Sequence, residues 1–126
     1  MTLTDIRALE SGVEIRRLIC EMMRLDAYEA DGSLWIADPQ YPGISETFSP
    51  DDDHNDAMKV TAWWVSKNAG NCLNIHYEKG HISVLVDRPD HEYQSATGPT
   101  LALAICRAVL LAAGQAAVRD IERRNS

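Results

Sequence analysis

The sequence has no long apolar run and few cysteines, and both absences exclude classes of protein. No stretch approaches the roughly 18 apolar residues of a membrane span, and no basic and then apolar signal segment opens the chain. The three cysteines are an odd number without metal-ligand spacing, which fits a reducing cytoplasm better than a disulfide framework. We therefore expect a cytoplasmic protein that does not associate with membranes.

Catalytic motifs are also missing. The chain has no Gly-rich phosphate loop, no Ser-His-Asp order and no paired metal ligands. The run Asp51-Asp52-Asp53-His54 contains side chains that can bind cations, but three successive acids cannot converge on one ion. We therefore interpret these acids as stabilising the positive end of a helix dipole. Cys72 and His76 lie about 13 Å apart on one predicted strand, too far for a nucleophile pair. We expect no enzyme, no metal and no cofactor.

The 126 residues suffice for one domain, residues 1–126, and are too few for two ordinary ones. Hydrophobic and charged fractions of 45% and 25% are ordinary globular values and exclude a wholly disordered chain. Patterning predicts helices over 4–24 (weakest at Gly12), from 49 to 70 and from 97 onward, and strands over 34–37, 72–77 and 81–87. These elements predict a layered α/β sandwich, in which helices pack on a short antiparallel sheet in the order α-β-α-β-β-α.

The negative charge is concentrated in one loop-rich segment. Residues 26–56 contain nine acids and no Lys or Arg, whereas residues 1–25 are neutral and residues 57–126 carry a net charge of +2. The nine acids are Asp26, Glu29, Asp31, Asp38, Glu46, Asp51, Asp52, Asp53 and Asp56. Two interpretations stay open: a solvated loop, or a surface whose field attracts a basic partner. A chain with a net charge of −7 is a poor candidate for binding nucleic acid directly.

Tryptophans provide candidate contact residues. Trp63 and Trp64 are adjacent on a predicted helix and point about 100° apart, so one is expected to pack on the sheet and the other to lie at a helix edge. The edge residue could contact a partner, or a wide interface could cover both. Trp35, inside the acidic segment, has the same two interpretations.

Three segments between residues 48 and 113 form a recognisable pattern. They are Asn55 to Met58 leading to the helix of Ala62 to Val65; the hairpin of Ile75, Tyr77, Ile82 and Val84; and Ala102 to Ala108, which includes an A-I-C-R-A segment. In this pattern residues 48–113 resemble the phage ABA sandwich domain, a family of small tailed-phage and prophage proteins. The resemblance implies a layered α–β–α domain encoded by a bacteriophage, with no settled activity.

These observations lead to a hypothesis of binding without catalysis. The chain would be a phage accessory protein of the host bacterial cytoplasm, an anti-CRISPR-like inhibitor whose acids occupy the basic nucleic-acid site of a host defence protein or ribonucleoprotein. The partner-binding residues would be Asp31, Asp38, Glu46, Asp51, Asp52, Asp53, Asp56, Trp35 and Trp63. One alternative is an oligomeric sponge for a nucleotide immune signal, which would use Trp64, Arg16, Arg17, Arg88 and Arg107. Another is a virion assembly component. A homodimer or higher homo-oligomer is compatible with all three.

Overall fold

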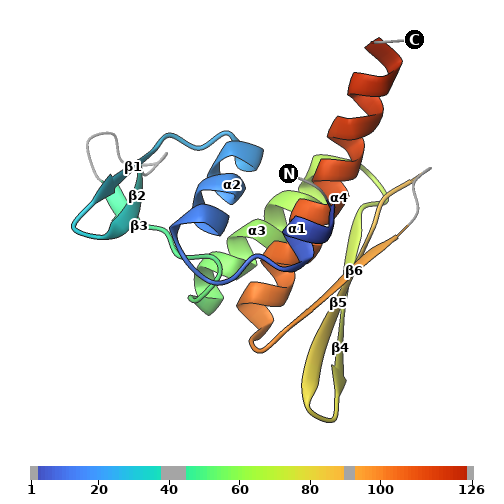
Figure 1. Ribbon diagram of the computed structural model, residues 1–126, viewed down its shortest axis with the longest axis horizontal. Helices are drawn as coiled ribbons and strands as arrows, with labels where there is room; N and C mark the ends of the chain where they lie inside the picture. Colours follow the sequence, from blue (N-terminus) through green and yellow to red (C-terminus); the bar gives the residue numbers. More distant parts are fainter. Residues whose placement is uncertain (1–2, 38–44, 90–92, 125–126) are drawn as a thin grey trace.

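One helix, α4 (Leu101–Arg124), runs through the middle of the fold. The computed structural model describes residues 3–37, 45–89 and 93–124, and Figure 1 shows α4 between a β-sheet and three other helices. Thr100 begins α4, because its Oγ1 accepts the backbone N–H of Leu103 at 3.2 Å. Residues 102–106 and 108–112 are all buried, so neighbours cover this part of α4 on every side. Its many alanines allow those neighbours to approach closely.

The larger sheet covers one side of α4. It contains β4 (Cys72–Glu78), β5 (His81–Asp87) and β6 (Gln94–Gly98), all antiparallel and in that spatial order. Alternation along β5 places Val84 and Val86 against α4, and Ala96 of β6 joins them in the core.

No helix in the described part of the chain is long and apolar enough to cross a membrane.

Three helices pack on the remaining sides of α4: α1 (Leu3–Arg7), α2 (Val13–Met23) and α3 (His54–Lys67). The Asp53 side chain begins α3 by accepting the backbone N–H of Asp56 at 3.0 Å. The buried face of α3 includes Ala57, Val60 and Trp64, which lie three or four residues apart.

A second, smaller sheet lies beyond α2 (Figure 1). It contains β1 (Ala27–Ala30), β2 (Ser33–Ala37) and β3 (Ser45–Thr47), antiparallel and in that order. Asp31 and Gly32 form the two-residue turn between β1 and β2, with φ of 53° and 76°. Leu34 and Ile36 are buried on one face of β2, so this sheet has an inner face toward α2 and an outer face toward solvent.

The predicted α/β class is confirmed, but the predicted element order is incomplete. The expected first helix is two helices, separated around Gly12, and α3 begins at His54 instead of Ser49, after a turn over 49–53. Sequence patterning missed β1, β3 and β6, and the last two residues of β6 fall where the third helix was predicted to begin. β6 contains mainly small and polar residues, and its pairing with β5 and its packing on α4 hold it as a strand.

Candidate functional site

The outer face of the small sheet presents two aromatic side chains together. Tyr28 of β1 lies directly opposite Trp35 of β2, and Thr47 of β3 lies opposite Trp35 on the other side. Side chains alternate between faces, so these three residues point away from the buried Leu34 and Ile36. Tyr28 is 51% exposed and Trp35 is half-buried. We call Tyr28, Trp35 and Thr47 the aromatic face.

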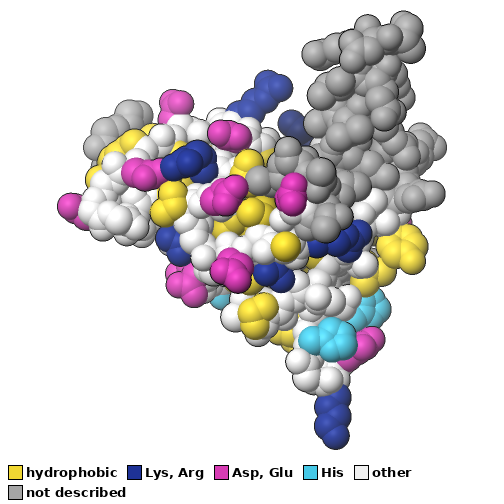
Figure 2. Space-filling view, in the orientation of Figure 1, with side chains coloured by type: hydrophobic (Ala, Val, Ile, Leu, Met, Phe, Trp, Pro, Cys, Tyr) yellow, Lys and Arg dark blue, Asp and Glu magenta, His cyan; other side chains and the backbone are white. Residues whose placement is uncertain are grey.

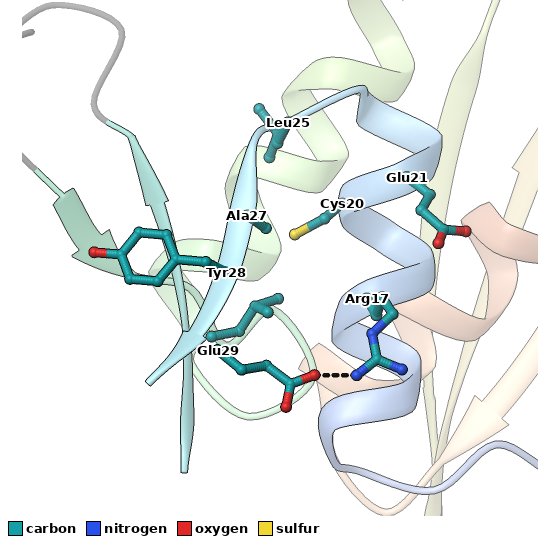
Figure 3. A pocket seen from close by; sticks show the side chains of 8 residues that line it. Arg17, Cys20, Glu21, Leu25, Ala27, Tyr28 and Glu29 are labelled. Atoms are coloured by element: carbon teal, nitrogen blue, oxygen red, sulfur yellow. Dashed lines mark hydrogen bonds and ion pairs between the residues drawn. The ribbon is translucent and has the colours of Figure 1, made fainter. Parts of the chain in front are cut away.

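The aromatic face is held in a defined conformation. The Trp35 indole Nε1–H donates to the backbone carbonyl of Ala30 at 3.1 Å. This bond satisfies the indole's one donor and fixes the ring across the sheet. Figure 3 shows Tyr28 directed away from α2, on the opposite side of β1 from Glu29. The surface is therefore preorganised before any partner arrives.

Two exposed carboxylates flank this sheet. Asp26 precedes β1 and Asp31 forms the β1–β2 turn, and both are exposed. Neither makes an ion pair within residues 3–37, 45–89 and 93–124. Glu29 differs, because it pairs with Arg17 of α2 (Figure 3). Figure 2 shows Lys and Arg side chains between the acids on this face of the molecule, so the negative field is patchy.

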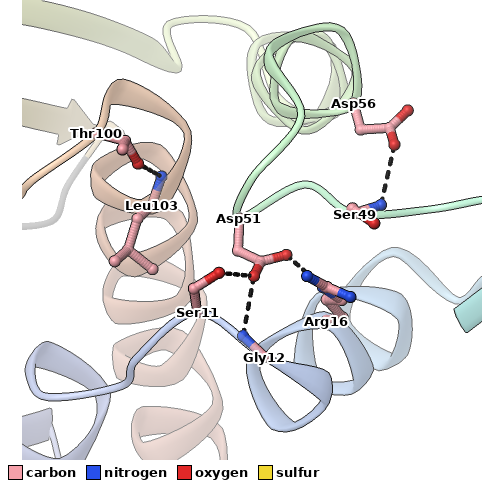
Figure 4. A network of polar contacts seen from close by, with 8 residues as sticks. All are labelled: Ser11, Gly12, Arg16, Ser49, Asp51, Asp56, Thr100 and Leu103. Carbon is pink, nitrogen blue, oxygen red and sulfur yellow. Dashed lines mark hydrogen bonds and ion pairs between the residues drawn. The ribbon is translucent and has the colours of Figure 1, made fainter. Parts of the chain in front are cut away.

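Asp51 corrects the expectation of one outward-facing acidic region. Its residue surface is 1% exposed, and it lies in the turn before α3 with its carboxylate directed toward the start of α2 (Figure 4). Its carboxylate accepts hydrogen bonds from the Ser11 hydroxyl, from the Gly12 backbone N–H at 2.9 Å and from Arg16 Nε at 2.7 Å. A carboxylate enclosed in this way joins two helices and cannot contact a partner.

Two further predicted contact acids are also paired with a base. Asp56 is buried and accepts the Ser49 backbone N–H at 2.9 Å, while its other oxygen lies 3.2 Å from Lys59 Nζ. The same ammonium reaches Glu46 at 3.2 Å. Burial lowers the pKa of Lys59, but its hydrogen bonds to Glu46 and Asp56 outweigh that effect and raise the pKa. Both acids are therefore partly neutralised.

The other predicted contact residues have separate surroundings. Asp52 and Asp53 are exposed at the start of α3, where Asp53 acts as the helix cap. Asp38 lies outside the described residues. Trp63 is half-buried, with Lys67 Nζ 5.4 Å from its ring centre. This cation–π contact occupies one face of the ring.

The residues of the nucleotide-binding alternative do not form a shared site. Trp64 is 2% exposed, and its Nε1–H donates to the Cys72 carbonyl at 3.1 Å, so it cannot stack on a base. Arg107 donates to the carbonyls of Leu9 and Thr97 at 2.7 and 2.9 Å, which connects α4 to the segment after α1 and to β6. Arg16 and Arg17 pair with acids, as above, and Arg88 lines a separate shallow hollow with Asn68 and Pro89.

A cleft of about 290 Å³ lies between α2 and β1 (Figure 3). Its walls include Cys20 and Leu25, and the Arg17–Glu29 ion pair joins its two sides. Burial, with a smaller contribution from the charge of Glu21, raises the pKa of Cys20 to about 11. The thiol is therefore protonated at neutral pH and is a poor nucleophile.

No group of three or more His, Cys, Asp or Glu side chains in the described segments is arranged to hold a metal ion.

No protein-family model matches the chain, and no curated protein matches it. Tyr28 was missed from the sequence because a single tyrosine in a short, polar strand has no pattern that distinguishes it.

Proposed function

We propose that this protein is a phage or prophage accessory protein that acts by stoichiometric binding, as an anti-CRISPR-like inhibitor of a basic host defence protein or ribonucleoprotein. The observation that carries the proposal is the solvent-facing pair of Tyr28 and Trp35, flanked by the exposed Asp26 and Asp31. The resemblance of residues 48–113 to phage proteins supports the phage origin, and the missing catalytic motifs favour binding over catalysis.

The two kinds of residue have different roles in such a complex. Exposed carboxylates accelerate the encounter with a basic groove, and this effect weakens as salt screens the charges. Aromatic side chains lose little conformational entropy on burial and are enriched among the residues that dominate binding energy. Because Asp51 is buried, the proposed contact surface is the aromatic face of the small sheet and not the start of α3.

Affinity capture from phage-infected bacterial lysate, at two salt concentrations, tests this surface. The variants are Tyr28→Ala and Asp31→Lys, and Tyr93→Ala is the matched control because Tyr93 is 64% exposed and precedes β6 of the other sheet. We expect Tyr28→Ala to shorten the lifetime of the complex and Asp31→Lys to slow its formation, most clearly at low salt. Equal capture by all three variants, or capture that does not depend on salt, would contradict the proposal.

Inhibition provides a second readout. In a plasmid-interference assay in the phage host, the wild-type protein and Tyr93→Ala should protect the target, and Tyr28→Ala should protect it less. If the purified protein also destroys a host nucleotide or nucleic acid catalytically, the stoichiometric mechanism is wrong.

A further inference from the structure

The strand β4 forms an exposed, unprotected edge of the larger sheet. It pairs with β5 on one side, and no described strand pairs with its other side. All its residues are exposed except the half-buried Leu73, and Ile75 and Tyr77 are 36% and 70% exposed. Proteins commonly protect such edges with proline, lysine or a bulge, and β4 contains none of these over seven residues in continuous register with β5.

The register of the β4–β5 hairpin shows which backbone groups face outward. Glu78 and His81 are paired across the two-residue turn, so they form a hydrogen-bonded pair. Hydrogen-bonded and non-hydrogen-bonded pairs alternate along an antiparallel ladder. His76 and Asn74 therefore direct their backbone N–H and C=O groups toward β5. The corresponding groups of Leu73, Ile75 and Tyr77 point to the open edge.

We propose that a second copy of this chain pairs with β4 through this edge, antiparallel, with the two-fold axis at Ile75. Each Ile75 then lies opposite the Ile75 of the second copy, and each Leu73 lies opposite a Tyr77. The outward backbone groups of these residues pair with no described strand, so one register satisfies the backbone bonds and aligns apolar side chains on the same face. The larger sheets of the two copies then join into one sheet of six strands.

The charge distribution favours a second copy at this edge. A chain with a net charge of −7 repels itself over most of its surface. From Asn68 to Tyr77, however, the sequence has no Asp, Glu, Lys or Arg. In the proposed register the first acid, Glu78, lies opposite Cys72 of the second copy, so the two Glu78 carboxylates stand about 20 Å apart along the strands. Like charges are thus kept away from the contact.

The pairing is self-complementary, as a two-fold interface requires. An odd number of residues places one residue on the axis, and the apolar Leu73 and Tyr77 exchange positions about it. On the opposite face Asn74 lies across from His76, so two polar side chains meet. An unrelated strand would need a matching pattern of its own, whereas a second copy already has it.

Light scattering coupled to size exclusion, over a concentration series, tests the dimer. We expect the wild-type mass to rise to twice 14.0 kDa, and Ile75→Lys to remain at 14.0 kDa because it places two ammonium groups on the axis. Tyr93→Lys is the control, since it also replaces an exposed residue by lysine and should still dimerise. Circular dichroism checks that Ile75→Lys folds. A monomeric wild-type chain throughout, or equal dimerisation of Ile75→Lys, would overturn the proposal.

Cross-linking tests the register without depending on affinity. Residues in a hydrogen-bonded pair have Cα atoms about 5.5 Å apart, within the range of a disulfide. In a Cys72→Ser background, Ile75→Cys should form a disulfide-linked dimer on mild oxidation. Tyr93→Cys in the same background should not. If Ile75→Cys does not cross-link, or if Tyr93→Cys links equally well, the two-fold axis is not at Ile75.

Discussion

Arg16 Nε donates to Asp51 Oδ1 across 2.7 Å, and the Asp51 side chain is fully buried. This contact makes the first acid of the run Asp51-Asp52-Asp53 a connection between the turn before α3 and the start of α2. Among the described acids, Asp26 and Asp31 stay exposed near the aromatic face. A charge pattern in sequence therefore overstates the charge that a partner would meet.

Asp51→Asn should destabilise the fold by about 2 to 4 kcal/mol, because it leaves the partly buried Arg16 guanidinium without its charge partner. Asp52→Asn, at the exposed neighbouring position, should change stability by less than about 0.5 kcal/mol. Urea unfolding of both variants measures the difference. Similar midpoints for the two would mean that the Asp51 network contributes little.

The adjacent tryptophans should differ strongly in their effect on stability. Trp64→Ala removes a buried ring and its hydrogen bond to Cys72, and should cost about 3 to 5 kcal/mol. Trp63→Ala removes a half-buried ring and its contact with Lys67, and should cost about 1 kcal/mol. Thermal and urea unfolding would reveal the contrast. A reversed order would mean that the two indoles exchange roles in solution.

Gly70 and Gly80 form a matched pair for measuring a steric contact. Their φ angles are 91° and 92°, so alanine at either position incurs a similar backbone strain of about 1 to 2 kcal/mol. A Cβ at Gly70 would also lie 2.7 Å from Pro89 Cγ, whereas a Cβ at Gly80 meets nothing within 4 Å. We expect Gly70→Ala to be the more destabilising substitution in urea unfolding. Equal losses of stability in the two variants would show that Pro89 moves away from the new Cβ at no cost in free energy.

Stability should fall as the pH rises above 9. Burial raises the pKa of Cys20 from 9.0 to about 11, so as the pH rises the thiol loses its proton in the unfolded chain before it does so in the folded one. This deprotonation stabilises the unfolded chain relative to the folded one. The loss from Cys20 should reach about 2 to 3 kcal/mol by pH 11. Burial, and then the charge of Asp51, raises the pKa of Cys106 in the same direction.

Urea unfolding at pH 7, 9 and 10.5 measures this dependence. Cys20→Ala should show a shallower decline than the wild type, whereas Cys72→Ala, at an exposed position, should decline as the wild type does. If Cys20→Ala leaves the slope unchanged, the thiol does not cause the pH effect.

Elements with strong local signals were predictable. The β4–β5 hairpin, the helix after Thr100 and the turn at Asp31-Gly32 each have a periodicity or a turn residue that acts over a few positions. The short strands β1, β3 and β6 have weak patterns of their own, and each is held by a neighbouring strand. Sequence patterning missed all three.

The acidic balance, the α/β class and the lack of catalytic motifs depend on composition and local periodicity, so they could be read directly from the order of the residues. The tertiary structure decided which acid is buried, which tryptophan is covered and which tyrosine faces solvent. These outcomes depend on partners distant in sequence, such as Arg16 for Asp51 and Cys72 for Trp64. Local periodicity can place a side chain on one face of a helix or strand, but it contains no information about what packs against that face.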